Sequence, residues 1–217
     1  MQRLLILIMA LCLIFAVLSG ITILIGRQQP LPEHLAILHL TDCAPPCWIG
    51  ITPGVTTLED AIPLIKAHYT NLPDYQTIFS GNLTMTTIYV SNLKNPGDAF
   101  SIVVRVYENG RVSTIGFDTY GSSSSPNIGE LTNILGTPTS ITSSTAAMFY
   151  DGITYTLAFS AYDCITATTV PYPDNHASVF QHPSSFYFGE RGDCDAQAKQ
   201  LPWQPWHGFR ELNGYFG

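Results

Sequence analysis

Cysteine is the residue type in this chain whose number and spacing most directly suggest chemistry. Four of the five cysteines follow the first 27 residues, at Cys43, Cys47, Cys164 and Cys194. The first two enclose Ala-Pro-Pro in a C-x3-C pattern, whereas thiol oxidoreductases use C-x2-C. An even number of cysteines favours structural disulfides in an oxidising compartment. We predict Cys43–Cys47 and Cys164–Cys194; the competing pairing joins Cys43 or Cys47 to Cys194.

Other reactive side chains do not complete a known catalytic pattern. Ser91 and Lys94 fit the S-x-x-K spacing of penicillin-recognising enzymes, but no S-D-N or K-T-G sequence accompanies them. Asp174, His176 and His182 lie in a proline-rich polar stretch, which favours surface positions over an acid–base or metal cluster. The sequence also has no P-loop, dinucleotide fingerprint or nucleophile elbow. We therefore predict no catalytic residues and no cofactor.

Metal binding is not expected either. Zinc sites use close pairs of cysteine or histidine, and no second close pair accompanies Cys43 and Cys47. His34 and His39 fall in the segment before the cysteines, where exposed or capping roles are the simpler interpretation.

A nearly unbroken apolar run occupies residues 4–25, beginning with Leu4 and ending with Ile25. A helix of that length crosses a hydrocarbon core of about 30 Å, and cleaved signal peptides have shorter apolar regions of about 7–15 residues. We predict an uncleaved signal anchor over residues 1–27, followed by a stalk over 28–42. The later cysteines place the folded part outside the cytoplasm, so the predicted location is a cell membrane, single-pass, with the C-terminal domain extracytoplasmic.

The charge balance limits the classes of partner. Charged residues make up only 12% of the chain. Without Arg3 and Arg27, seven basic residues stand against sixteen acidic ones, a net charge of −9. An acidic exported region disfavours nucleic acid and anionic lipid surfaces as partners. We expect the partner to be another envelope protein.

The predicted first helix–β unit covers residues 43–120. Thr56 followed by Glu59 forms a capping box at the start of a helix. The apolar stripe of that helix repeats with helical spacing at Leu58, Ala61, Ile62 and Ile65. Strands are predicted at 75–80, 83–91, 99–108 and 111–118.

Asn109 and Gly110 separate the last two of these strands. Asn-Gly between alternating hydrophobic residues predicts a two-residue type I′ hairpin. That turn pairs two buried couples, Val104 with Ile115 and Ile102 with Phe117. The opposite, wetter face then shows Arg105, Tyr107, Val112 and Thr114.

The predicted second unit covers residues 121–217. Asn127 and Glu130 form another capping box, and Gly136 ends the helix. Strands are predicted at 147–150 and 153–159 around Asp151-Gly152, and then at 165–170, 179–181 and 185–188. The expected fold class is α+β: an N-terminal transmembrane helix, then two helix-plus-antiparallel-strand units that form a mainly antiparallel sheet with the helices packed on one face.

Aromatic side chains supply the candidate binding surface. Trp and Tyr are enriched among the residues that dominate protein interfaces. The candidates are Trp48, Tyr107, Trp203 and Trp206. The alternative is that the C-terminal aromatic residues form a strap packed across the sheet.

Two short segments have the pattern of a helix–hairpin repeat. Gly54, Val55, Thr56 and Glu59 match its start, and residues 135–138, reading Leu-Gly-Thr-Pro, match its end. These segments resemble the BamE-type small outer-membrane-assembly lipoproteins and the β-lactamase-inhibitor-protein-like fold. Residues 47–56 also resemble a Cys-Trp-x-Gly-Ile-x-Pro-Gly-x-Thr motif of uncharacterised membrane-anchored bacterial proteins. The resemblance implies tandem helix–β-hairpin units that bind other proteins and carry no catalytic residues.

Together these observations predict a membrane-anchored extracytoplasmic binding domain of the bacterial envelope, without catalysis. A small-molecule or glycan sensor and a hydrolase of unfamiliar pattern are the alternatives. A flat aromatic sheet face would favour a binding domain, a closed apolar pocket a sensor, and a deep polar cleft with convergent ionisable groups an enzyme.

The disulfide pairing is testable by peptide mapping without reduction. We expect one fragment that joins Cys43 to Cys47 and another that joins Cys164 to Cys194, because the first pair is close in sequence and the second pins the C-terminal third to the sheet. A fragment linking the Cys43–Cys47 region to Cys164 or Cys194 would contradict this pairing.

Overall fold

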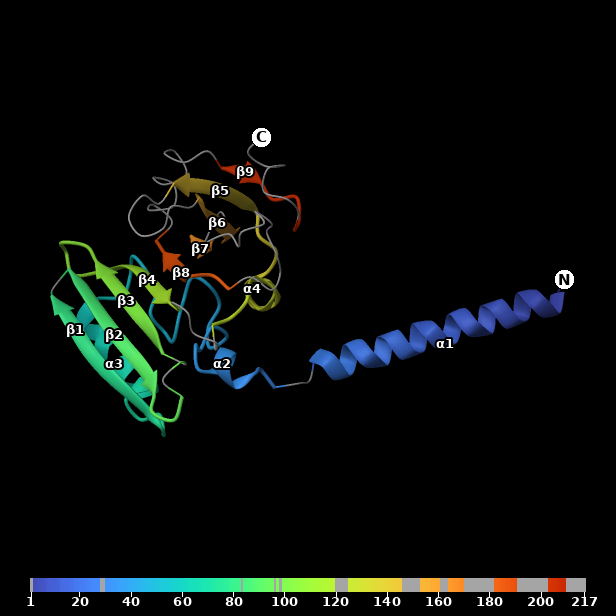
Figure 1. The fold of residues 1–217 in the computed structure, drawn as a ribbon, viewed down its shortest axis with the longest axis horizontal. Coiled ribbons are helices and arrows are strands. Elements are labelled where there is room, and N and C mark those ends of the chain that lie inside the picture. Colours follow the sequence, from blue (N-terminus) through green and yellow to red (C-terminus); the bar gives the residue numbers. More distant parts are fainter. Residues whose placement is uncertain are drawn as a thin grey trace. The chain divides into compact units, whose positions relative to one another are not determined.

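The chain divides into two compact units, Met1–Glu33 and His34–Gly217. The first unit contains helix α1 (Gln2–Arg27), drawn in blue at the N-terminus in Figure 1. The second contains the sheet and the helices α3 and α4. The computed structural model describes residues 2–27, 30–82, 84–95, 97, 99–119, 125–145, 153–160, 164–169, 182–190 and 203–209.

The transmembrane helix predicted for residues 1–27 is wrong. Within the part of the chain that the structure describes, no helix combines the length and the apolar character needed to cross a membrane. The prediction rested mainly on the length of the apolar run, and length alone does not establish that a helix crosses a membrane.

The nine described strands form one antiparallel sheet in the order β1-β2-β3-β4-β8-β7-β6-β5-β9. The predicted fold class is corrected accordingly: one strand-rich sheet with four described helices, none of them able to cross a membrane, replaces the anchored pair of helix–strand units. The strands are β1 (Tyr75–Asn82), β2 (Met85–Asn92), β3 (Phe100–Val106), β4 (Val112–Asp118), β5 (Ser140–Thr145), β6 (Ile153–Ser160), β7 (Ile165–Thr169), β8 (Ser185–Gly189) and β9 (Gln204–Pro205).

Two antiparallel meanders make up this sheet (Figure 1). β1 to β4 are neighbours in chain order, and β5 to β8 follow in reverse order across the sheet. β4 pairs with β8, with Gly116 opposite Tyr187 at the centre of the pairing. Local sequence signals cannot reveal this contact, because it joins strands about seventy residues apart, and it converts two meanders into one continuous surface.

Helix α3 (Leu58–Tyr69) begins one residue later than predicted. Thr57 is the N-cap, and its hydroxyl oxygen accepts a hydrogen bond from the backbone N–H of Asp60 at 3.2 Å. Thr56 belongs to the preceding turn instead. Its hydroxyl oxygen accepts from the Thr52 N–H at 2.9 Å, and its carbonyl oxygen accepts from the Val112 N–H at 2.8 Å. The strand contact therefore decides which threonine caps the helix.

Helix α4 (Ile128–Leu135) begins as predicted. The side chain of Asn127 accepts from the Glu130 N–H at 2.9 Å, and the Glu130 carboxylate accepts from the Asn127 N–H at 2.8 Å, so the capping box is confirmed. Gly136 follows the helix with φ 89°, a left-handed conformation that costs glycine little. A short helix, α2 (Glu33–Ala36), precedes both and buries Leu35.

The β3–β4 hairpin has the predicted register but a different turn. Val104 pairs with Ile115 and Ile102 pairs with Phe117, as predicted. The Gly110 N–H donates to the Tyr107 carbonyl oxygen at 2.9 Å, and Gly110 has φ 80°. These are the features of a three-residue loop that ends in a glycine bulge, not of a type I′ turn.

A second irregularity in this hairpin corrects the prediction for its wetter face. The register shifts between Arg105 and Val106, so that Val106 pairs with Val112. This bulge restores the register for the rest of the hairpin and turns Val112 into the core, where it is 0% exposed. Arg105 and Thr114 remain on the outer face.

The second hairpin starts earlier than predicted. Thr145 pairs with Ile153, whereas the predicted hairpin would pair residue 150 with Ile153. The predicted strands at 147–150 and 179–181 lie outside the described residues. β7 and β8 agree with the predicted strands to within one residue at each end.

One hydrophobic core packs against the sheet, and both α3 and α4 contribute to it. Trp48 is 1% exposed; its indole Nε1 donates to the Leu38 carbonyl oxygen at 2.8 Å, and its ring meets Phe117 edge to face at 5.0 Å. Tyr69 stacks on Trp48 at 6.0 Å, and its hydroxyl donates to the Ile37 carbonyl oxygen at 2.8 Å. These two side chains therefore tie the segment around residue 38 to α3 and to the sheet.

The observed cap gives a stability prediction. Thr57→Ala removes the hydroxyl that accepts from Asp60 and should lower the free energy of unfolding by about 0.5–2 kcal/mol, measured by denaturant titration. Thr57→Ser keeps the oxygen and is the matched control. Equal midpoints for Thr57→Ala and Thr57→Ser would contradict the capping role.

Candidate binding site on the open face of the sheet

A hollow of about 430 Å³ lies on the face of the sheet that points away from Trp48. Side chains of β2, β3, β4 and β8 line it, so both meanders contribute. We call it the sheet hollow; its lining residues are Met85, Thr87, Tyr89, Ser101, Val103, Arg105, Asp118 and Tyr187.

Strand alternation explains why these side chains meet. β3 buries Ile102 and Val104 in the core, so its alternate residues, among them Val103 and Arg105, face the hollow. The pairing of β2 with β3 places Thr87 beside Val103 and Met85 beside Arg105. The register of the paired strands therefore determines which side chains line the hollow. Hydroxyl, apolar and charged groups meet there.

Tyr187 forms one wall of the sheet hollow by lying across Gly116. A Cβ atom on residue 116 would overlap the Tyr187 ring, so the absence of a side chain makes room for it. The Tyr187 hydroxyl donates to the Asp118 carboxylate at 3.3 Å, and the Arg105 guanidinium lies 6.0 Å from the ring centroid. That distance is at the outer limit of a cation–π contact. The Tyr187 ring therefore lies against the Gly116 backbone, with the Asp118 carboxylate at its hydroxyl and the Arg105 guanidinium near its face.

The charged groups of the hollow differ in exposure. Arg105 is exposed, whereas Asp118 is half-buried. Burial raises the pKa of the Asp118 carboxyl, and the hydrogen bond from Tyr187 and the charge of Arg105 offset part of that shift. Burial also raises the pKa of the Tyr187 phenol, and the nearby Asp118 charge adds to the increase. Arg105 accordingly presents a cationic group to solvent, while the carboxylate beside it is partly withdrawn.

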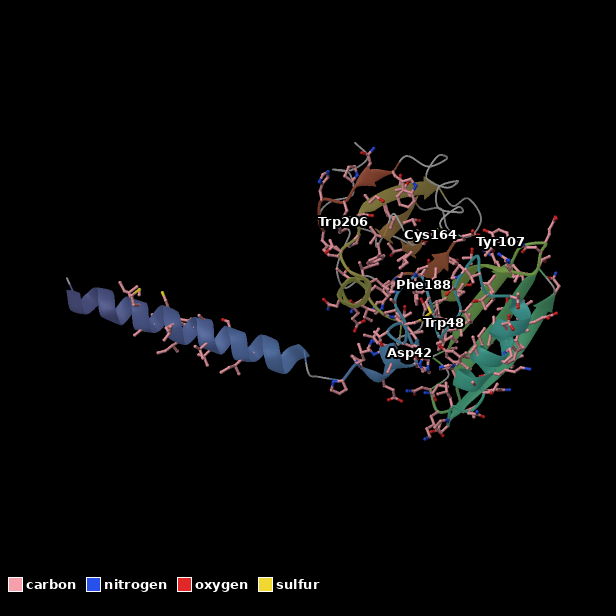
Figure 2. The ribbon with its side chains drawn as sticks, turned by 180° about the vertical axis from the view of Figure 1, so that it is seen from behind. Asp42, Trp48, Tyr107, Cys164, Phe188 and Trp206 are labelled. Atoms are coloured by element: carbon pink, nitrogen blue, oxygen red, sulfur yellow. A yellow bond between two sulfur atoms is a disulfide. The ribbon has the colours of Figure 1, made fainter. Side chains whose placement is uncertain are left out.

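The four aromatic residues predicted as a binding surface lie in separate places. Trp48 is in the core, and Tyr107 is half-buried at the β3–β4 turn. Figure 2 shows Tyr107 and Trp206 on opposite sides of the folded unit. Trp203 and Trp206 flank β9, and Trp206 meets Phe209 edge to face at 5.0 Å. The sequence indicated four aromatic residues as candidates. None of them lines the hollow; the tyrosines that do are Tyr89 and Tyr187.

Trp206 agrees with the alternative prediction that the C-terminal aromatic residues form a strap packed across the sheet. Trp206 packs against the core, and its backbone N–H donates to the Thr139 carbonyl oxygen at 3.0 Å. The indole Nε1 of Trp203 is buried, and no hydrogen-bond partner for it is found among the described residues.

The disulfide prediction is confirmed for its first pair. Cys43 and Cys47 are bonded, with their Cα atoms 5.7 Å apart. Cys164 is also disulfide-bonded. Its predicted partner, Cys194, lies outside the described residues, so that pairing stays a prediction.

The S-x-x-K candidates do not form a catalytic pair. Ser91 is in β2, whereas Lys94 is exposed and forms an ion pair with Asp74 at 2.6 Å. His182 bonds the Ser125 carbonyl oxygen through Nδ1 at 2.7 Å. Asp174 and His176 lie outside the described residues. The ion pair between Lys94 and Asp74 lies on the surface, and neither residue lines the sheet hollow.

Sequence reasoning identified Arg105 as outward-facing but missed Asp118 and Tyr187. Local hairpin rules orient Arg105 and also place Asp118 opposite Ser101, whereas Tyr187 joins the hollow only through the β4–β8 pairing. Gly116 within the predicted strand 111–118 was the available signal, since a glycine within a strand often marks the close approach of another group.

No protein-family model, curated protein or solved structure matches this chain.

The raised pKa of Asp118 predicts a pH-dependent effect on stability. Because the folded-state pKa lies above the unfolded value of about 3.9, the folded state favours the protonated carboxyl, and stability falls as the pH rises through that window. Asp118→Asn removes this cost and can still accept from Tyr187. We expect the variant to melt at a higher temperature than the wild type at pH 7.

The difference should shrink as the pH is lowered to about 3, where the wild-type carboxyl is protonated in both states. Thermal melts at the two pH values measure it. Glu108→Gln is the matched control, because that exposed carboxylate lies outside the hollow. A lower melting temperature for Asp118→Asn at pH 7 would contradict the prediction.

Proposed function

We propose that this chain is an extracytoplasmic binding domain without catalytic activity, and that the sheet hollow contacts a partner protein. The observation behind the proposal is an exposed arginine among exposed apolar side chains on an otherwise acidic chain. The chain has a formal net charge of −7, so a cationic group beside a hollow is a candidate contact for an acidic partner.

Exposed apolar side chains lie on the open face of β1 and β2. Tyr89 is 51% exposed and Met85 43% exposed, and both line the hollow. Ile78 of β1 pairs with Tyr89 and is also 51% exposed. Exposed apolar groups beside a charged group are typical of interaction sites, where tyrosine and arginine often dominate the binding energy.

These groups indicate the chemistry of the partner. A carboxylate from the partner would meet the guanidinium of Arg105, and an apolar neighbour would pack on Tyr89 and Met85. Among the described residues, no carboxylate lies within ion-pairing distance of Arg105, which leaves its five N–H donors open to such a group.

The lining of the hollow supports binding rather than catalysis. Among the described residues, its lining contains one carboxylate and neither histidine nor cysteine. Asp118 is engaged by the Tyr187 hydroxyl, and a general acid–base pair needs a second titratable group near it. The Cys43–Cys47 disulfide supports an oxidising compartment, since such bonds are rare in the cytosol.

Photo-crosslinking in the native host tests the proposal. A benzophenone amino acid in place of Tyr89 should form an adduct with one discrete protein, because its reactive group then faces the hollow. The same amino acid at Val55, which is 68% exposed outside the hollow, is the positional control. Arg105→Ala should abolish the adduct from position 89.

Arg111→Ala is the matched charge control, because it removes an exposed arginine that bonds the Gly54 carbonyl oxygen and does not line the hollow. It should leave the adduct unchanged. Equal adducts from positions 89 and 55 would contradict the proposal. An adduct that is still formed in Arg105→Ala would also contradict it.

A small-molecule ligand is the second candidate, because a hollow of about 430 Å³ falls within the usual range of ligand pockets, about 300–1,000 Å³. In that case position 89 yields no protein adduct. Native mass spectrometry of the full chain would instead show a retained ligand that is lost in Arg105→Ala.

A further inference from the structure

Three potential metal ligands converge on the opposite side of the core from the sheet hollow. His39 and Asp42 lie in the segment that follows α2, and His68 lies in the last turn of α3. One ligand atom from each residue lies within 4.8 Å of the others. We call this group the His–Asp–His cluster; Asp42 is labelled in Figure 2.

The distances within the cluster bracket those of a metal site. Nδ1 of His39 lies 2.8 Å from Oδ2 of Asp42, and Nε2 of His68 lies 3.9 Å from the same oxygen. Zinc bonds nitrogen and oxygen ligands at about 2.0–2.2 Å, so neighbouring ligand atoms in a tetrahedral site are about 3.3 Å apart. Metal binding would therefore replace the hydrogen bond between His39 Nδ1 and the Asp42 carboxylate, and the proton on Nδ1 would be released as the ion binds.

The hydrogen bonding of His68 prepares it to bind a metal. Its Nδ1 lies 2.8 Å from the Leu64 carbonyl oxygen, which can only accept, so Nδ1 carries the proton. The lone pair is then on Nε2, the atom that faces Asp42. A backbone carbonyl that fixes the tautomer in this way is the usual companion of a metal-bound histidine.

The backbone of His39 is also arranged for this contact. Its φ of 52° is in the left-handed region, where histidine is one of the more frequent residues after glycine, and its N–H donates to the Ala36 carbonyl oxygen at 3.1 Å in the turn that ends α2. In this conformation its ring meets the His68 ring edge to face at 4.9 Å and the Tyr69 ring at 5.7 Å. The turn after α2 therefore places the His39 imidazole beside that of His68.

We propose that His39, Asp42 and His68 bind a divalent transition-metal ion of the zinc class. Two imidazoles and one carboxylate are ligands that suit zinc, iron, cobalt and nickel, and they suit magnesium and calcium poorly. The three side chains are between 24% and 39% exposed, so water can reach the ion and occupy at least one remaining position.

The bound ion would connect two elements next to a disulfide. Asp42 directly precedes Cys43, and His68 precedes Tyr69, whose hydroxyl already bonds the Ile37 carbonyl oxygen. An ion bound only by the folded state stabilises it by mass action. The site would therefore fasten the segment from residue 37 to residue 47 onto α3.

Titration of Zn²⁺ into the chelator-stripped full-length chain tests the proposal. Isothermal titration calorimetry should show one site, and saturating Zn²⁺ should raise the melting temperature, whereas Mg²⁺ should not. His39→Asn, Asp42→Asn and His68→Gln should each weaken Zn²⁺ binding by at least about tenfold, the loss typical of even indirect damage to a metal site. Asparagine tolerates the left-handed backbone at residue 39, so that variant removes the imidazole alone.

His207→Gln is the matched control, because His207 is an exposed histidine beside β9, outside the cluster. Its Zn²⁺ affinity should equal that of the wild type. The absence of Zn²⁺ binding to the wild type would overturn the proposal. So would unchanged affinity in the cluster variants, or an equal loss in His207→Gln. The three substitutions lie on two elements, so a folding defect in one leaves the others to decide.

Discussion

The pairing of β4 with β8 is the contact on which both faces of the sheet depend. On the core face it places Phe117 against Phe186, whose rings stack 4.6 Å apart with an interplanar angle of 9°. On the open face the same pairing sets Tyr187 over Gly116 and within reach of Asp118. Side chains alternate between the faces, so a slip of one residue would expose Phe186 and bury the Tyr187 hydroxyl. A single register thus fixes the aromatic centre of the core and the wall of the hollow.

The features that local sequence could predict are those whose hydrogen bonds close within a few residues. The capping box of α4 and the pairing of Val104 with Ile115 in the β3–β4 hairpin depend on neighbouring residues, and both agree with the prediction, whereas the hairpin's turn and the bulge after Arg105 do not. The cap of α3 was displaced by one residue, because Thr56 also bonds Val112 on a distant strand. The membrane helix was inferred from length and hydrophobic content, and the structure does not support it.

The candidate sites could be predicted less well than the fold. Trp48 was expected at a surface because of its residue type, yet it occupies the core, where its indole N–H has a partner. The sheet hollow needs the β4–β8 pairing, which no local pattern contains. His39 and His68 are far apart in sequence, and only the packing of α3 against the segment before Cys43 brings their rings together. A search for closely spaced ligand pairs therefore could not detect them.

The two edges of the sheet differ in their capacity to recruit another strand. β9 covers β5 with only two residues, and one of them is Pro205, which has no N–H to offer. Further growth of the sheet on that side is discouraged. The outer strand on the other side is β1, eight residues long, with Ile78 exposed on it. Edge-to-edge association of two copies, whether in crowded solution or during refolding, would therefore begin at β1. A charged residue introduced at that edge is the change that would suppress it.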